Sequence, residues 1–285
     1  MAEGATAAGS ERGKAEGLSE QRELASGKLI LDEPAAHVLR IKISNPAKRG
    51  ALDHEILDTL AKTVREADAR CLLITGDGPV FSAGYDIGSF EDERTFSQAA
   101  EKLVAHPFTH ALEAIDAYRY PVVAAINGHA IGGGLELALS CDVRIAARGV
   151  KMGMPPAKIG LIYSHTGLRK FIEICGVANT AELFLVGRNV DADRGYDMGL
   201  VNRVVEPDEL EQAALGVARE IGANSPLSLA GNKTIMRALR AADVHVPPEL
   251  EAKLVELRES CFATEDFREG IQAFGEKRTP DWKGR

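Results

Sequence analysis

The sequence contains few cysteines, and no two of them are close together. Cysteines 71, 141, 175 and 261 lie far apart in the chain of 285 residues. This spacing argues against a disulfide framework and against a zinc site built from closely spaced cysteine pairs. We expect reduced, mostly buried thiols in a cytoplasmic protein that holds no metal. No apolar run approaches the roughly 20 residues needed to span a bilayer, so we expect no membrane partner.

An excess of positive charge is also missing. The chain has 34 Lys and Arg against 42 Asp and Glu, a formal net charge of −8. Binding to a phosphate backbone favours clustered Lys and Arg, so the composition argues against nucleic acid as a partner. Hydrophobic residues make up 45% and charged residues 27%, which is the ordinary balance of a globular protein with one or two domains.

Large apolar residues are nearly absent from residues 1–28, so we expect this segment to be a disordered or loosely docked arm. It lacks the apolar stretch of a secretory signal and has too many acidic residues for a mitochondrial presequence. From residue 29 to about 220, short buried strands alternate with helical patterns, which predicts an α/β core with a mainly parallel sheet. Residues 221–285 are predicted to form a helical C-terminal region.

The individual elements follow from hydrophobic periodicity and turn residues. Asp53 is expected to cap a helix whose apolar positions are 56, 57, 60, 61 and 64. The other expected elements are strands at 38–43, 71–75, 121–126 and 143–147, and helices at 99–117, 227–242 and 249–263.

The most informative segment runs from residue 127 to residue 137. A buried strand leads into Gly132, Gly133 and Gly134, and a helix follows. Unpaired amides in the first turn of a helix, together with the helix dipole, stabilise negative charge. Glu136 lies on the same turn and offers a carboxylate for proton transfer. A glycine turn that allows tight packing of helix on strand is the alternative interpretation. The segment does not match the GxGxxG pattern of dinucleotide sites.

A second glycine-containing loop, Phe81-Ser82-Ala83-Gly84-Tyr85-Asp86-Ile87, follows an expected strand. With the glycines at 132–134, it makes the chain resemble the crotonase (enoyl-CoA hydratase/isomerase) superfamily from about residue 29 to the C-terminus. The resemblance also includes the motifs Asn45-Pro46, Gly50-Ala51-Leu52, Gly199-Leu200-Val201-Asn202 and Phe262-Ala263-Thr264-Glu265-Asp266.

This resemblance implies a spiral of repeated ββα units, whose C-terminal helices assemble homotrimers or dimers of trimers. It implies an acyl-CoA thioester as substrate and no cofactor beyond the CoA moiety. By position, the backbone amides of Tyr85 and Gly133 would form an oxyanion hole for a thioester enolate. Lys48 and Arg49 would contact the nucleotide phosphates, Ala83 and Gly84 the pantetheine, and Lys277 the ligand of a neighbouring subunit. Solvated surface is the alternative for the two basic residues at 48 and 49.

The reaction within the superfamily depends on a second position. Hydratases of the family hold a water between two carboxylates; the first matches Glu136, but the second position is Pro156. Pro156 with Tyr163 resembles the methylmalonyl-CoA decarboxylase branch, although that branch often has His where this chain has Tyr85. We therefore expect decarboxylation of a short malonyl-type CoA ester, with Tyr163 orienting the substrate carboxylate. Enoyl-CoA hydration by Glu136 and a catalytically silent scaffold are the alternatives, and Tyr163 could equally be a core residue.

Overall fold

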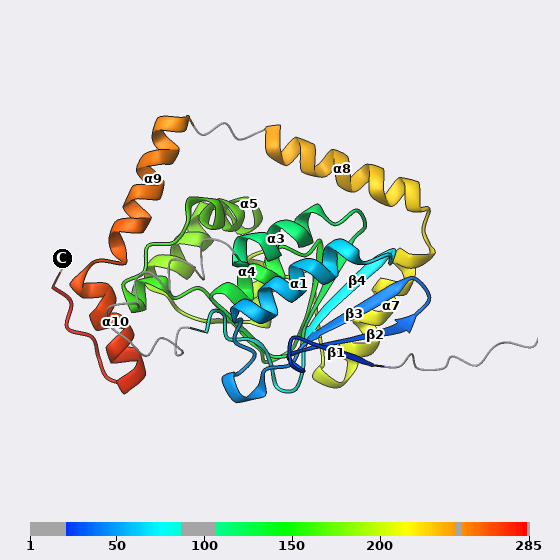
Figure 1. Ribbon diagram of the computed structural model, residues 1–285, viewed down its shortest axis with the longest axis horizontal. Coiled ribbons are helices and arrows are strands. Elements are labelled where there is room, and N and C mark those ends of the chain that lie inside the picture. The colour runs from blue at the N-terminus through cyan, green and yellow to red at the C-terminus, as the bar shows by residue number, and fades with distance from the viewer. Residues whose placement is uncertain (1–20, 87–106, 243–246, 284–285) are drawn as a thin grey trace, which may run out of the picture.

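The structure is a computed structural model that describes residues 21–86, 107–242 and 247–283 (Figure 1). Within these residues the larger sheet has seven strands in the order β1-β2-β3-β4-β6-β8-β11. They are β1 (Arg22–Leu24), β2 (Leu29–Ala35), β3 (Val38–Ile43), β4 (Cys71–Gly76), β6 (Val122–Ile126), β8 (Val143–Ala147) and β11 (Arg203–Val205). The first three pair antiparallel and the other neighbours pair parallel, which confirms the α/β class.

A smaller sheet, also counted over the described residues, has four strands in the order β10-β9-β7-β5. They are β5 (Val80–Ser82), β7 (His129–Ile131), β9 (Lys151–Gly153) and β10 (Val190–Asp191). Successive strands alternate between the two sheets. β4, β6 and β8 belong to the large sheet, and the strands that follow them, β5, β7 and β9, belong to the small sheet. The repeat β6–β7 then continues into helix α4 (Gly133–Leu139), and β8–β9 is followed by α5 (His165–Ala181). This pattern confirms the expected ββα units.

The described helices agree closely with the sequence periodicity. Asp53 caps α1 (His54–Glu66) by accepting a hydrogen bond from the amide of Ile56, and the five predicted apolar positions of this helix are all buried. The predicted helix at 99–117 is described from residue 107 onward, and its first part lies outside the described residues. The other helices are α3 (Pro107–Ala117), α6 (Ala192–Asp197), α7 (Leu210–Ala223), α8 (Pro226–Ala242), α9 (Pro248–Cys261) and α10 (Glu265–Glu276).

The core lies between the large sheet and the helices. α7 packs against β4, β6 and β8, and α1 packs against α3. The four cysteines are buried and free, as the sequence predicted. Burial raises the pKa of Cys71 and of Cys141 to about 12, so both thiols are protonated and unreactive at neutral pH.

Two expectations about element boundaries need correction. The arm was expected to extend to residue 28, but residues 22–24 form β1, which pairs with β2. Of the two expectations for this segment, disorder or a loosely docked arm, disorder does not hold for residues 22–24, and residues 1–20 lie outside the described residues. Pro248 was expected in the connection between two helices, but it is the first residue of α9. The fixed backbone angle of proline suits the first turn of a helix, where its missing amide has no partner to lose.

The C-terminal helices lie at the edges of the molecule. Figure 1 shows α8 extended along one side, and α9 and α10 at the end of the molecule where the chain terminates. Several large apolar side chains of α8 are exposed, among them Ile235, Met236 and Leu239. Among the described residues, no helix is both long enough and apolar enough to cross a membrane.

Candidate active site

The first glycine-containing loop follows β5 and runs beside Leu52. The amide of Leu52 donates to the carbonyl oxygen of Gly84 over 2.7 Å, and the amide of Asp86 donates to the carbonyl of Leu52 over 3.1 Å. The peptide bond between Gly84 and Tyr85 is trans, so its C=O and N–H point in opposite directions. Because the Gly84 carbonyl faces Leu52, the N–H of Tyr85 points away from Leu52.

The second glycine loop joins β7 to α4. The carbonyl oxygen of Gly132 accepts hydrogen bonds from the amides of Leu135 and Glu136, at 3.0 and 3.1 Å. This carbonyl therefore points into the first turn of the helix. The N–H of Gly133, on the other side of the same trans peptide, points out of the N-terminal end of α4. Gly132 is held in place by its own amide, which donates to Gly153 over 2.9 Å.

The two loops touch at Gly84. A Cβ atom on Gly84 would lie 3.0 Å from the amide nitrogen of Gly133 and 2.7 Å from the carbonyl oxygen of Ile131. Gly84 also has a φ of +90°, which L side chains rarely adopt. Only glycine at this position lets the loops approach this closely. Within the described residues, neither the Tyr85 amide nor the Gly133 amide donates a hydrogen bond to another group of the chain.

An apolar cavity of about 130 Å³ opens beside these amides. Tyr85 and Gly133 line it, and so do Pro156 and Tyr163, the two positions that the sequence singled out for the choice of reaction. Apolar residues from the C-terminal region complete the wall: Phe262, Phe267, Ile271 and Phe274. The sequence predicted the two loops and the residues at 156 and 163, and the structure brings all of them to one cavity. The apolar residues of the C-terminal wall were not predicted.

Glu136 and Tyr163 are joined by a hydrogen bond, in which the phenol donates to Oε2 of the carboxylate. Glu136 is only 5% exposed and Tyr163 only 7%. Burial raises the pKa of the Glu136 carboxyl, although Lys170, Tyr163 and Arg258 each act in the opposite direction. Burial, with the nearby charge of Glu136, also raises the pKa of Tyr163 well above its ordinary value. The carboxyl is therefore easier to protonate than an exposed glutamate.

Tyr163 packs against the core and also faces the apolar cavity. Its ring lies edge-to-face against Phe184, with centroids 5.4 Å apart, as a core residue would. Tyr163 also lines the apolar cavity, as does Tyr85.

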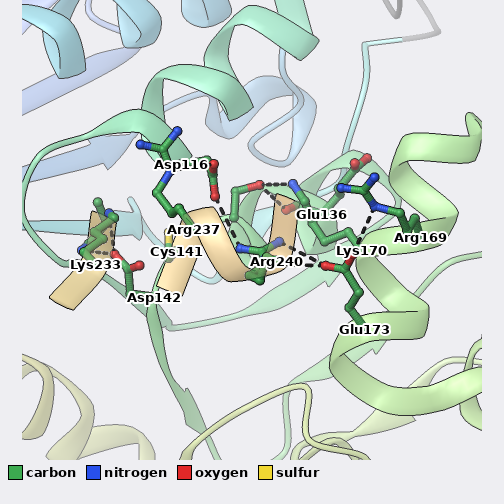
Figure 2. Close-up of polar contacts among 12 residues, drawn as sticks. Asp116, Glu136, Cys141, Asp142, Arg169, Lys170, Glu173, Lys233, Arg237 and Arg240 are labelled. Atoms are coloured by element: carbon green, nitrogen blue, oxygen red, sulfur yellow. Dashed lines mark hydrogen bonds and ion pairs between the residues drawn. The ribbon is translucent and has the colours of Figure 1, made fainter. Parts of the chain in front are cut away.

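Glu136 itself lines a second, polar cavity of about 250 Å³. Tyr85 lines both cavities. The polar cavity receives basic residues from three helices: Arg169 and Lys170 from α5, Arg240 from α8 and Arg258 from α9. Figure 2 shows Lys170, Arg169 and Arg240 in the same region as Glu136. Sequence reasoning missed these residues because no short motif connects them to Glu136.

The residues expected to contact CoA fall into two groups. Lys48 forms an ion pair with Asp86 over 2.5 Å, and the carbonyl of Arg49 accepts from the amide of Ala83 over 3.1 Å. The turn at 48–49 is thus bonded directly to the first glycine loop. Lys277 follows the last residue of α10 as its C-cap, with a positive φ of 55°.

Two glycine loops on a ββα spiral, beside an apolar cavity, define an acyl-CoA enzyme of the crotonase type. The model of the enoyl-CoA hydratase/isomerase family matches residues 33–285, and the chain belongs to this family.

Relatives and solved structures agree with this assignment. The chain is 34% identical over 250 residues to a probable enoyl-CoA hydratase of Bacillus subtilis, covering 86% of this chain and 94% of that protein. It is 30% identical over 254 residues to a short-chain-enoyl-CoA hydratase of Clostridium acetobutylicum, covering 87% and 95%. Its fold is similar to a methylmalonyl-CoA decarboxylase in complex with 2-nitronate-propionyl-CoA, with a TM-score of 0.81 at 27% identity, covering 90% of this chain and 99% of that one.

Proposed function

We propose that this enzyme decarboxylates a short malonyl-type CoA ester, such as a methylmalonyl-like thioester. The observation that carries the proposal is the lining of the apolar cavity: Pro156 and Tyr163 face the same space as the amide-bearing residues Tyr85 and Gly133. A second carboxylate beside the reacting group would repel the carboxylate of such a substrate. Proline at position 156 removes that repulsion. When Glu136 is protonated and donates to the phenol oxygen, the hydroxyl of Tyr163 is a neutral hydrogen-bond donor for the substrate.

The reaction needs no base to remove a proton. The bond between the α-carbon and the carboxylate breaks, carbon dioxide leaves, and the electron pair moves onto the thioester as an enolate. The N–H groups of Tyr85 and Gly133 stabilise the negative oxygen. Loss of one such donor typically costs about 3 kcal/mol of transition-state stabilisation. The enolate then takes one proton at carbon, so that each turnover consumes one proton and yields carbon dioxide and a saturated acyl-CoA.

Binding of the CoA part is assigned to the residues around the first loop. Lys48 and Arg49 bind the nucleotide phosphates, and the backbone of Ala83 and Gly84 contacts the pantetheine. The ion pair of Lys48 with Asp86 supports this placement, because it holds the ammonium group beside the loop. Lys277 contacts the ligand of a neighbouring subunit. No cofactor beyond the CoA moiety takes part.

We also propose that the C-terminal helices assemble a homotrimer or a dimer of trimers. The exposed apolar side chains of α8 support this, because burial against another copy would remove them from water. The buried free thiols fit a cytoplasmic enzyme, since thiols stay reduced there. Sedimentation of the purified protein tests the assembly, and a monomer at micromolar concentration contradicts it.

Enoyl-CoA hydration is the second candidate. The names of the two hydratase relatives favour it, and Glu136 is a carboxyl placed to exchange a proton. Against it, Glu136 lines the polar cavity, while its partner Tyr163 lines the cavity beside the amides. A hydratase also needs a group to replace the second carboxylate, and Pro156 cannot serve as an acid or a base.

The deciding experiment offers methylmalonyl-CoA and crotonyl-CoA to the purified protein in parallel. We expect carbon dioxide and a saturated acyl-CoA from the first, and a loss of about 100-fold in kcat/KM with Tyr163→Phe. Tyr118→Phe is the matched control, because it removes a buried phenol hydroxyl that bonds to the backbone of Ala69, away from the site. A 3-hydroxyacyl-CoA product that depends on Glu136 supports hydration instead. No product from any CoA ester supports the scaffold.

A further inference from the structure

The hydrogen bond between Tyr163 and Glu136 connects two cavities of opposite character. Tyr163 lines the apolar cavity beside the amides of Tyr85 and Gly133. Glu136 lines the polar cavity, together with charged residues of α3, α5, α8 and α9. A proton can therefore pass between water in the polar cavity and the apolar cavity through two side chains, without water entering the space that holds the reacting group.

Lys170 is fixed next to Glu136 by the turn that ends α4. Its ammonium nitrogen donates to Oγ of Ser140 over 2.6 Å, and Oγ of Ser140 donates to the carbonyl oxygen of Glu136 over 2.9 Å. Figure 2 shows the Lys170 side chain extending from α5 to the region of Glu136. The positive charge favours the ionised carboxylate and lowers the pKa of Glu136, against the effect of burial.

The other charged groups around this pair come from each neighbouring helix. Arg258 of α9 also lowers the pKa of Glu136. Asp116 of α3 raises the pKa of Lys170, whereas Arg240 of α8 lowers it. Burial has the largest effect on Lys170 and lowers its pKa, so the ammonium also releases its proton more easily than an exposed lysine. The pKa of Glu136 is thus raised and the pKa of Lys170 is lowered, so that the two pKa values lie closer together than those of exposed side chains.

Two neighbouring cations of the cavity, Arg240 and Arg169, are already paired with carboxylates. Arg240 bonds to Asp116 over 3.4 Å and to Glu173 over 3.2 Å. Arg169 precedes Lys170 in α5 and lines the same cavity, but its guanidinium pairs with Glu173 over 3.0 Å. Arg169 is not among the groups that shift the pKa of Glu136. Lys170 therefore differs from its neighbour in acting directly on the carboxyl.

We propose that the polar cavity is the route by which solvent protons reach Glu136, and that Lys170 is the positioning residue that keeps this carboxyl able to release its proton to Tyr163. The proposal rests on the decarboxylation above for its final acceptor, the enolate. The enolate carbon takes the hydroxyl proton of Tyr163 as its electron pair forms the new C–H bond. Tyr163 regains a proton from Glu136, and Glu136 regains one from water in the polar cavity.

The physical reason is that a proton donor works best when its pKa lies near the operating pH. A buried glutamic acid without a nearby cation would keep its proton too firmly. Lys170 offsets part of that burial, and the Ser140 bond holds its charge at a constant position. Replacing Lys170 by Met keeps much of the side-chain volume and removes the charge.

The first test is independent of turnover. The carbonyl stretch of protonated Glu136 is followed by infrared spectroscopy as a function of pH, and the band is assigned by its loss in Glu136→Gln. We expect Lys170→Met to move the titration midpoint upward by on the order of one pH unit. Arg169→Met is the matched control and leaves the midpoint within a few tenths of a unit of the wild type. An unchanged midpoint in Lys170→Met, or an equal shift in both variants, overturns the proposal.

The second test follows kcat against pH with methylmalonyl-CoA. Glu136 must be protonated to supply Tyr163, so kcat falls as pH rises through the pKa of Glu136, and this fall moves to higher pH in Lys170→Met. A fall that stays in place while the infrared midpoint moves overturns the proton route. If no malonyl-type ester is turned over, the proposed function is overturned, while the infrared result still decides the role of Lys170. Circular dichroism of each variant verifies that it is folded.

Discussion

The phenol of Tyr163 donates a hydrogen bond to Oε2 of Glu136, although the two residues lie 27 positions apart, on different elements. The bond joins two side chains that line different cavities: Tyr163 lines the apolar cavity, and Glu136 lines the polar one. A carboxyl that reaches the reacting group through a phenol differs from one that contacts it directly. This relationship is the main structural argument for interpreting the site differently from that of a hydratase with two carboxylates.

Gly84→Ala is expected to impair catalysis more than folding. A Cβ at this position would collide with Ile131 and with the amide of Gly133, so the two glycine loops would move apart. We expect kcat to fall by at least about 100-fold, the cost of losing one amide donor. Steady-state kinetics with the active CoA ester measures the effect.

Gly78→Ala is the matched control for Gly84→Ala. Gly78 has a similar φ of +80°, but nothing lies within 4 Å of the position of its Cβ. The Gly78→Ala substitution therefore introduces the same kind of backbone strain as Gly84→Ala, about 1–3 kcal/mol, but its Cβ collides with no other atom. Equal kcat values for the two alanine variants would contradict the role assigned to Gly84.

Glu136→Gln is expected to stabilise the protein at neutral pH. The folded-state pKa of Glu136 is raised, so the unfolded chain ionises first as pH increases and binds fewer protons than the folded chain. The wild type therefore loses stability as pH rises from its unfolded value, about 4.3, through the folded pKa. Urea unfolding of both proteins checks this. The free energy of unfolding of the variant should exceed that of the wild type near pH 8, and the difference should be absent near pH 4. The reverse pH dependence would show that folding favours the ionised carboxylate.

Lys233→Met is expected to destabilise the attachment of α8. The nearly buried ammonium of Lys233 donates to Asp142 over 2.7 Å and to the carbonyl of Tyr120 over 3.0 Å, as Figure 2 shows for the carboxylate. Asp142 is partly exposed and still accepts from the amide of Val122 over 2.7 Å, so we expect a loss of about 1–3 kcal/mol, the value of hydrogen bonds to a charged group. Thermal or urea unfolding measures the loss. The double variant Lys233→Met with Asp142→Asn should recover part of it, and no recovery would mean that the pair itself contributes little.

Lys48→Ala is expected to weaken binding of the CoA ester without slowing the chemical step. A contact between a partly exposed lysine and a phosphate is worth about 1 kcal/mol, so KM should rise roughly fivefold with kcat unchanged. Lys62→Ala, on the exposed face of α1, is the control and should change neither constant. A fall in kcat with KM unchanged would place Lys48 in the chemical step instead.

The sequence was sufficient for the parts of the fold that depend on local patterns. The five apolar positions of α1 and its cap at Asp53 follow the helical period, and the structure confirms them. The two glycine loops were also predictable, because glycine at 84 and 132–134 follows expected strands and permits tight turns and close backbone approaches that other residues do not. β1 was missed because its three residues are exposed, and an exposed edge strand has no apolar alternation to reveal it.

The candidate site was predictable only where a motif carries it. Tyr85, Gly133, Glu136 and Tyr163 were each identified from the sequence, but the bond between the last two depends on how α4 and the segment before α5 are packed. Lys170 was missed for the same reason, since its position beside Glu136 is set by Ser140 on a different helix. Contacts between distant segments depend on tertiary packing, which periodicity and spacing do not encode.

Tyr85 has a consequence beyond its backbone amide, because this aromatic residue lines both cavities. The ring is held edge-to-face against Phe108, with centroids 4.7 Å apart. A smaller side chain at this position would enlarge the apolar cavity, and we expect it to admit a longer acyl chain. The size of the side chain at position 85 would in this way limit the length of the acyl group that the enzyme accepts.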